Sequence, residues 1–288
     1  MTDGEVQFGL TEADLARIPT GFAPGLFDGR VALVSGGGSG IGKGIAALLA
    51  RLGADLVICG RNEERLARSA DWLRGLGARV LARPASIREP DQVEALMDAA
   101  AAEFGGIDLL VNNAGGQFPK DAIDIPYKGW RAVVDTNLNG TWYMMQNAAR
   151  RWRDAGRPGA VVNILAPFWP GMPQLAHSTA ARAGVAYMTK CVAVEWAPLG
   201  IRVNGVNPGT IESSGQRVYP AEGLATFKRS SPMMRMGNVH DIAQAVVYLG
   251  AHSGNFVTGE IIDVDGGRHC RGGSWPAGKP AYFAAGDP

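Results

Sequence analysis

The feature that most constrains the fold is a short apolar run, Val31–Val34, that ends abruptly in the glycine-rich segment Ser35–Gly42. The run is β-branched at both ends and flanked by turn residues, so it predicts a buried strand. Beyond the glycines, apolar residues recur at helical spacing at Ile41, Ile45, Leu48, Leu49 and Leu52. The order of strand, glycine turn and helix predicts a backbone that approaches a pyrophosphate closely, with the helix N-terminus holding the anion.

Further strands and helices alternate along the chain after this first pair. Strands are predicted at residues 55–60, 79–84, 108–111, 160–165, 202–206 and 261–264, and helices at residues 63–76, 90–104, 127–153, 175–196 and 239–251. Strands separated by helical stretches of this length form parallel βαβ units. The sequence therefore predicts the α/β class, as a single-domain, three-layer doubly wound parallel sheet with ligands at the carboxyl ends of its strands.

This domain is assigned to residues 29–268, and the chain has a short segment on each side of it. Residues 1–28 are predicted to be an N-terminal extension that lies on the domain. The extension includes a short helix at residues 11–18, in which Thr11 is the N-cap and Asp14 the third helical residue. Residues 269–288 form a C-terminal tail, which is expected either to pack on a neighbouring subunit or to be disordered.

Composition narrows the classes of partner. The chain has 288 residues, of which 46% are apolar, so one large core is expected. Its 28 Lys and Arg nearly balance its 27 Asp and Glu, which favours a small-molecule substrate over nucleic acid or an acidic membrane surface. Cys59, Cys191 and Cys270 are widely spaced, so neither disulfides nor a metal site is expected. The absence of a long apolar run and of a signal peptide predicts a cytoplasmic location.

Arg61 follows the second predicted strand, 19 positions after Gly42. A dinucleotide-binding fold places there the residue that meets the adenosine ribose. A carboxylate would bond both ribose hydroxyls and repel a phosphate, whereas a guanidinium can clamp a 2′-phosphate with two hydrogen bonds. The sequence therefore favours NADP(H), with NAD(H) as the alternative. Arg61 is equally consistent with a solvated start to the next helix, whose expected N-cap is Asn62.

Three other segments suggest local function. Residues 112–115 follow the strand predicted at 108–111 and carry amide and small side chains. They either leave room for, and bond to, a sugar or base, or form a plain turn. Asn137 and Gly140 are poor helix formers within the helix at 127–153, so a local distortion is expected there. Residues 212–235 are irregular and basic, and form either a mobile lid or a solvated surface loop.

Four motifs stand in one order along the chain: Ser35-Gly36-x-x-x-Gly40-Ile41-Gly42, Asn112-Asn113-Ala114-Gly115, Asn207-Pro208-Gly209 and Asp265-Gly266-Gly267. Together they resemble the short-chain dehydrogenase/reductase family over about Gly29–Arg268. The combination is far more specific than the glycine turn alone. The resemblance implies a Rossmann fold, a nicotinamide dinucleotide, hydride transfer and a homo-oligomer, commonly a tetramer built through the long helices.

The same resemblance implies which residues meet the cofactor: Gly36, Ser39, Gly40, Ile41, Gly42, Arg61, Asn113, Ala114, Gly115, Pro208, Gly209, Ile211 and Ser213. Ser213 stands where the family usually has a Thr. Ser86, followed by Ile87, stands where an Asp usually meets the adenine.

The active-site positions depart from the family pattern. The family places a Tyr, and a Lys four residues later, at the positions that read Ser178 and Arg182 here. The family's Ser would fall in residues 164–167, which carry no hydroxyl, and only Asn137 of the usual tetrad remains. Tyr187 lies nine residues beyond Ser178, which at about 100° per residue puts it on the opposite helix face. We therefore expect Tyr187 in the core or in a subunit interface.

Within the family, two segments resemble peroxisomal trans-2-enoyl-CoA reductase and its bacterial relatives: His177-Ser178-x-Ala180-Ala181-Arg182-Ala183-Gly184-Val185 and Asn112-Asn113-Ala114-Gly115-Gly116-Gln117-Phe118. This resemblance implies that NADPH reduces a 2-enoyl thioester, with an acyl-CoA as the expected substrate. The hypothesis is that Ser178 donates to the thioester oxygen. Arg182 would stabilise the developing charge and position the nicotinamide ribose, and Asn137 would hold a nearby water.

Two alternatives stay open. One is an alcohol dehydrogenase or carbonyl reductase for a branched or terpenoid substrate, with an acid borrowed from His177 or Tyr219. The other is a catalytically silent nucleotide-binding subunit, which the loss of the tetrad favours. Ser178 and Arg182 would then be an ordinary helix-surface residue and a salt-bridge partner.

Overall fold

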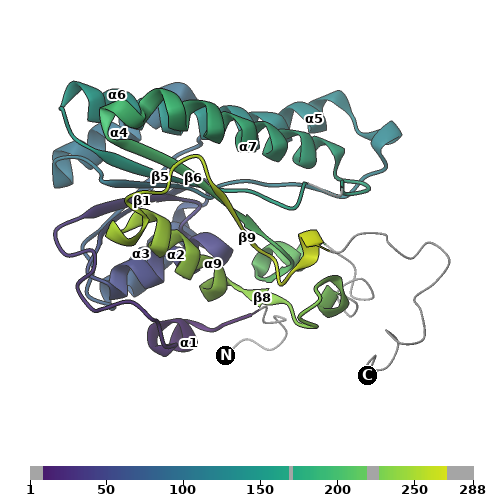
Figure 1. The fold of residues 1–288 in the computed structure, drawn as a ribbon, viewed down its shortest axis with the longest axis horizontal. Coiled ribbons are helices and arrows are strands. Elements are labelled where there is room, and N and C mark those ends of the chain that lie inside the picture. The colour runs from purple at the N-terminus through teal and green to yellow at the C-terminus, as the bar shows by residue number, and fades with distance from the viewer. Residues whose placement is uncertain (1–8, 169–170, 219–226, 271–288) are drawn as a thin grey trace.

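The computed structural model describes residues 9–168, 171–218 and 227–270 (Figure 1). Its centre is a seven-stranded parallel sheet with the strand order β3-β2-β1-β4-β5-β6-β9. The strands are β1 (Val31–Ser35), β2 (Asp55–Gly60), β3 (Val80–Pro84), β4 (Leu109–Asn112), β5 (Gly159–Ile164), β6 (Ile201–Pro208) and β9 (Ile261–Val264). The strand order reverses between β1 and β4, which confirms the predicted doubly wound α/β fold in a single domain.

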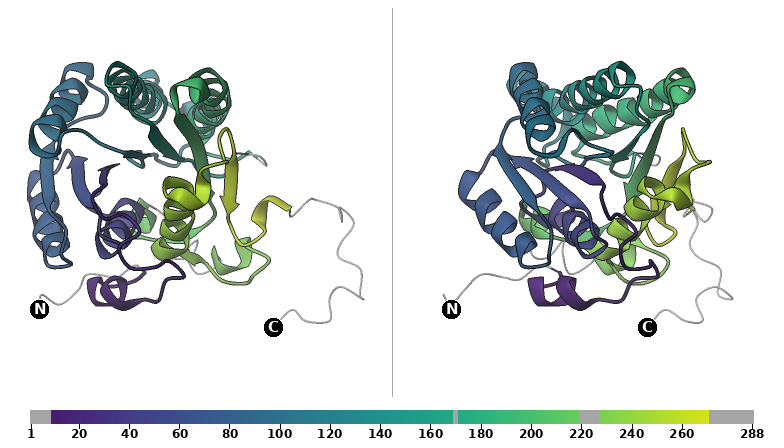
Figure 2. Two further views of the ribbon diagram at one scale, coloured as in Figure 1. Left: turned by 60° about the vertical axis from the view of Figure 1, so that its left-hand side comes forward. Right: turned by 90° about the vertical axis from the view of Figure 1, so that its left-hand side faces the viewer.

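Helices cover both faces of this sheet (Figures 1 and 2). One face carries α4 (Pro90–Phe104), α5 (Tyr127–Val134), α6 (Gly140–Asp154) and α7 (Ala176–Trp196), and the other carries α2 (Gly40–Arg51), α3 (Glu63–Arg74) and α9 (Val239–Gly250). Each helical layer buries its own apolar cluster against the sheet, so the molecule has three layers. No helix among the described residues is both long and apolar enough to cross a membrane.

The N-terminal segment lies on α2, as predicted. Its helix α1 (Glu12–Arg17) starts with a reciprocal capping box between Thr11 and Asp14. Leu15 is buried in the core, and Arg51 of α2 donates hydrogen bonds to the carbonyl groups of Leu15 and Ile18. The other end of the chain, residues 271–288, lies outside the described residues, so the expectations for the tail are not tested beyond Cys270.

The long helix predicted at residues 127–153 is interrupted, as expected. A π-helical turn, Asp135–Asn139, separates α5 from α6. Two features differ from the predictions. Strand β6 continues to Pro208, because its last residues pair with β9. The two ends of the segment predicted to be irregular, residues 212–235, are also joined by a short strand pair that was not predicted, β7 (Ile211–Glu212) with β8 (Gly237–Asn238). That pairing joins residues distant in sequence, which local patterns do not indicate.

The close approach of α2 to α9 gives a prediction for stability. A Cβ atom at Gly44 would lie 2.6 Å from the Val239 side chain. We expect Gly44→Ala to lower the free energy of unfolding by about 1–2 kcal/mol despite the higher helix propensity of alanine. Chemical denaturation measures the change. Gly21→Ala is the control, because no atom lies within 4 Å of the added methyl group. Equal stability of the two variants would contradict the prediction.

Candidate active site

A cleft of about 740 Å³ opens at the carboxyl edge of the sheet, where the strand order reverses. The cleft is lined by most of the residues predicted to meet the cofactor: Gly36, Ser39, Gly40, Ile41, Arg61, Ser86, Ile87, Asn113, Ala114, Gly115 and Ser213. These residues come from five separate segments of the chain. The fold therefore brings together groups that the sequence analysis could connect only through the family resemblance.

The glycine turn shapes one wall of the cleft. Gly36 and Gly40 have φ angles of +70° and +53°, which a side chain rarely adopts. Ser39 is the N-cap of α2 but makes no side-chain capping bond, and the first turn of α2 contains no acidic residue. The leading N–H groups of α2 and its positive dipole end are therefore available to an anion. Gly42 lies behind this wall, where a Cβ atom would meet the Gly36 oxygen at 2.4 Å.

Ser35 ties the glycine turn to the loop after β4, and sequence reasoning missed this role. Its buried hydroxyl accepts hydrogen bonds from the backbone N–H groups of Asn113 and Ala114, both at 3.0 Å. The Asn113 amide donates back to the Ser35 carbonyl at 2.9 Å. The sequence feature that indicates this role is a hydroxyl residue, Ser35, at the last position of the buried strand β1. These bonds fix two walls of the cleft relative to each other.

Three arginines line the cleft. Arg61 was predicted there, whereas Arg65 and Arg88 were not. Asn62 caps α3 by accepting from the Arg65 N–H group at 2.8 Å, as the alternative interpretation of this segment expected. Within the described part of the chain, none of the three guanidinium groups has an ion-pair partner. The cleft therefore presents uncompensated positive charge beside the end of β2.

Arg182 lies deep beside the cleft, with only 6% of its surface exposed. Its guanidinium donates to the Ile164 carbonyl at 2.8 Å and to the Asn137 side-chain oxygen at 3.5 Å. Burial lowers the pKa of Arg182 to about 10, so the group stays charged at neutral pH. Among the described residues no carboxylate pairs with it. Arg182 is thus a buried positive charge held by neutral oxygen atoms, not the salt-bridge partner considered as an alternative.

Asn137 connects Arg182 to the loop after β4. It lies in the π-helical turn, and its side-chain amide accepts from the Gly116 N–H group at 3.0 Å and donates to the Gly116 carbonyl at 2.9 Å. Gly115 fits directly against the guanidinium, because a Cβ atom there would lie 2.1 Å from an Arg182 nitrogen. The loop, the π-helical turn and α7 therefore meet around one charged group.

Ser178 lies one helical turn before Arg182 on α7 and is also buried. Its hydroxyl donates to the Gln117 side-chain oxygen at 2.8 Å, a partner that the sequence analysis did not assign. His177 is fully buried, and its ring meets Phe118 edge to face. Tyr187 is 64% exposed, so the expectation that it lies in the core is wrong, and its place in a subunit interface stays a prediction.

The remaining predicted cofactor residues lie apart from the main cleft. Pro208 is buried at the end of β6, and Gly209 and Ile211 line a separate cavity of about 230 Å³ beside Asp265. Tyr219 lies outside the described residues. By contrast, the three predicted catalytic residues, Asn137, Ser178 and Arg182, all contact the loop after β4.

Neighbouring glycines in this loop give a matched test of the packing around Arg182. We expect Gly115→Ala to lower the free energy of unfolding by about 1–3 kcal/mol, because the methyl group displaces the guanidinium. Gly116→Ala is the control, since its methyl group meets no atom within 4 Å. Denaturant titration of both variants measures the difference. A neutral effect of Gly115→Ala would contradict the prediction that Arg182 is held tightly against Gly115.

Comparison with known proteins agrees with this geometry. A family model described as enoyl-(acyl carrier protein) reductase matches residues 36–269. A probable 2,4-dienoyl-CoA reductase of Bacillus subtilis is 33% identical over 244 residues, covering 83% of this chain and 96% of the relative. The peroxisomal 2,4-dienoyl-CoA reductase of Danio rerio is 36% identical over 255 residues, covering 85% of this chain and 83% of the relative.

A solved structure shows the same relationship. The citronellol catabolism dehydrogenase AtuB of Pseudomonas aeruginosa PAO1 superposes with a TM-score of 0.78 at 38% identity, covering 87% of this chain and 99% of that structure. The match to the family model, together with the Rossmann-type sheet and cleft, shows that this chain belongs to the short-chain dehydrogenase/reductase family and is an NAD(P)-dependent oxidoreductase.

Proposed function

We propose that this protein uses NADPH to reduce a 2-enoyl-CoA thioester by delivering hydride to the β-carbon. The observation that carries the proposal is the buried charge of Arg182, which has no carboxylate partner among the described residues and stands at the position of the family's lysine. A charge buried without a counterion is costly. Such a charge is useful where negative charge develops during a reaction.

The missing tyrosine fits conjugate reduction better than carbonyl reduction. Hydride addition to a ketone produces an alkoxide, which needs a strong proton donor as it forms. Addition to the β-carbon of an enoyl thioester produces an enolate, whose charge is spread and less basic. Hydrogen-bond donors and a fixed positive charge can stabilise this species without transferring a proton to it. Arg182 stays protonated and charged at neutral pH, so the role proposed for it is electrostatic.

The other side chains of the site take supporting roles. Ser178 turns its hydroxyl from Gln117 to the thioester oxygen and donates a hydrogen bond to it. Asn137 uses its side-chain amide to hold the loop and Arg182, and its main-chain oxygen accepts from the Thr141 hydroxyl at 2.9 Å, so its role here is to position Arg182 rather than to hold a water. Solvent supplies the proton for the α-carbon. Gly115 lines the cleft and packs against the Arg182 guanidinium, so Arg182 would lie close to the nicotinamide ribose of a bound cofactor and help to position it.

The cleft fits a nicotinamide dinucleotide. It combines the uncapped N-terminus of α2, two glycines with positive φ angles and a volume of about 740 Å³. The cofactor supplies a hydride when bound. Arg61, Arg65 and Arg88 would surround a 2′-phosphate on its ribose, which favours NADPH over NADH.

Replacing Arg61 tests this cofactor preference. We expect Arg61→Ser to raise the Kd of NADPH about 10-fold or more while changing that of NADH less than about 3-fold, because a charge-assisted phosphate contact is lost. Isothermal calorimetry measures both constants. Arg68→Ser is the control, since Arg68 is an exposed residue of α3 that pairs with Glu64 and does not line the cleft. Tighter binding of NADH than NADPH by the unmodified protein would contradict the proposed preference.

Replacing Arg182 separates function from stability. We expect Arg182→Met to lower kcat for crotonyl-CoA reduction at least about 100-fold, because stabilisation of the enolate is lost. Removal of a buried unpaired charge should leave the free energy of unfolding unchanged or raise it by about 1–2 kcal/mol. Lys190→Met removes an exposed charge from the same helix and should change neither quantity. Full activity of Arg182→Met would exclude the proposed mechanism.

A second candidate is oxidation or reduction of a branched or terpenoid alcohol or ketone. The name of the similar Pseudomonas dehydrogenase, which concerns citronellol, favours it. His177 is the described candidate acid, but its ring is fully buried. The names of the dienoyl-CoA reductases favour a conjugated acyl thioester instead. Oxidation of NADPH with enoyl-CoA, dienoyl-CoA, citronellal or no substrate distinguishes these activities from a catalytically silent protein.

We also propose that the protein forms a homo-oligomer, with a tetramer as the expected state, in the cytoplasm. Large apolar side chains are exposed on the outer helices, including Tyr127 at 91%, Tyr187 at 64% and Val194 at 79%. α5 and α7 therefore offer an apolar surface suited to a second copy.

A further inference from the structure

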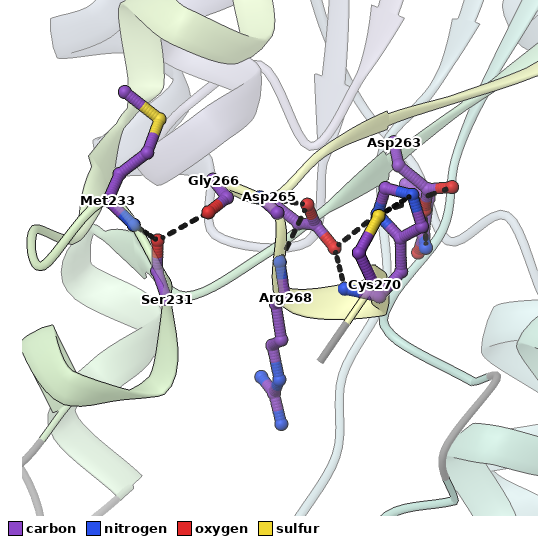
Figure 3. Close-up of polar contacts among 10 residues, drawn as sticks. Ser231, Met233, Asp263, Asp265, Gly266, Arg268 and Cys270 are labelled. Carbon is purple, nitrogen blue, oxygen red and sulfur yellow. Dashed lines mark hydrogen bonds and ion pairs between the residues drawn. The ribbon is translucent and has the colours of Figure 1, made fainter. Parts of the chain in front are cut away.

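A second group of reactive side chains lies where β9 ends, outside the main cleft. The turn Asp265–Gly267 leads into a single 3₁₀ turn, Arg268–Cys270. Figure 3 shows Asp263, Asp265 and Cys270 gathered at this point. Asp263, Asp265 and His269 also line the cavity of about 230 Å³. No step of the proposed reduction uses these side chains.

The Asp265 carboxylate is fully occupied. It is 8% exposed, and one of its oxygens accepts from the backbone N–H groups of Gly267 and Arg268 at 2.8 and 3.1 Å. The other oxygen accepts from the backbone N–H group of His269 at 2.7 Å and lies 3.0 Å from the imidazole Nδ1 of the same residue. Because these contacts use all its lone-pair directions, Asp265 is suited to orienting His269 rather than to binding a metal.

This contact determines which imidazole nitrogen is free. The Asp265 carboxylate can only accept, so Nδ1 of His269 carries the hydrogen atom. In the neutral ring Nε2 is then the acceptor, and it lies 3.1 Å from the Cys270 sulfur. The Cys270 thiol can therefore donate its proton to Nε2. Thiol, imidazole and carboxylate stand in the order of nucleophile, base and orienting group.

The other two cysteines of the chain lack this arrangement. Cys59 is fully buried, and burial raises the pKa of its thiol to about 12. Cys191 is exposed like Cys270, but the described residues provide no hydrogen-bond partner for its sulfur. Cys59 is thus shielded from solvent, Cys191 is exposed with no base among the described residues, and Cys270 is exposed beside the base His269.

We propose that Cys270 is a site of covalent modification by α,β-unsaturated carbonyl compounds, with His269 as its general base and Asp265 as the residue that positions His269. His269 takes the thiol proton, and the sulfur forms a bond to the β-carbon while the carbon–carbon π electrons move to the carbonyl oxygen. The resulting enolate receives the proton on its α-carbon from the imidazolium. The thiol is added across the double bond with no external oxidant or reductant, and neither NADPH nor the main cleft takes part.

Alkylation of the full-length protein with limiting N-ethylmaleimide tests this assignment. Peptide mapping by mass spectrometry gives the rate at each cysteine in the same sample. We expect Cys270 at pH 7 to react at least about 10-fold faster in the folded protein than in the same protein unfolded in urea, because unfolding separates the thiol from its base and a thiolate is the reactive species, and Cys59 to stay unmodified in the folded protein. Equal rates at Cys270 in the folded and unfolded protein would overturn the proposal.

Two variants isolate the base. His269→Asn should reduce the rate at Cys270 in the folded protein to within about 2-fold of that in the unfolded protein, since the thiol keeps its exposure but loses its proton acceptor. His269→Gly should do the same, and free imidazole in solution should restore the faster reaction. His252→Asn is the control, because His252 is an exposed histidine whose described contact is with Asn255. An unchanged Cys270 rate in His269→Asn would also overturn the proposal.

Discussion

The arrangement of the active site depends on one interaction, the burial of a positive charge at Arg182 without a negative partner among the described residues. Three elements supply only neutral groups to hold it: the Ile164 carbonyl at the end of β5, Asn137 in the π-helical turn, and Gly115, which leaves room for it. Such a charge destabilises the folded protein unless an anion approaches it. This cost is understandable if the site stabilises negative charge that is present only during the reaction.

The doubly wound sheet places this charge beside the cleft. Both lie at the carboxyl ends of neighbouring strands, where the crossover leaves an opening. Ser35 joins the glycine turn to the loop after β4, and Asn137 joins that same loop to α7 through Arg182. A short series of hydrogen bonds therefore connects the wall suited to a pyrophosphate with the group suited to stabilising an enolate.

Patterns within single segments allowed much of the fold to be predicted. The Thr11 cap of α1, the Asn62 cap of α3 and the distortion near Asn137 depend on neighbouring residues, and the structure confirms each. Contacts between distant segments were not predictable from local patterns. The β7–β8 pairing, the Ser35 cross-link and the bond from Ser178 to Gln117 join residues whose proximity exists only in the folded chain. The grouping of Arg65 and Arg88 with Arg61 has the same cause.

The carbon atom that receives the hydride distinguishes conjugate reduction from carbonyl reduction. NADPH deuterated at C4 of the nicotinamide can be incubated with the protein and crotonyl-CoA, and the product examined by NMR spectroscopy. We expect butyryl-CoA with deuterium at C3, the β-carbon, because Arg182 and Ser178 stabilise charge on the thioester enolate. Deuterium on a carbinol carbon, or transfer only to substrates without a conjugated thioester, would contradict this expectation.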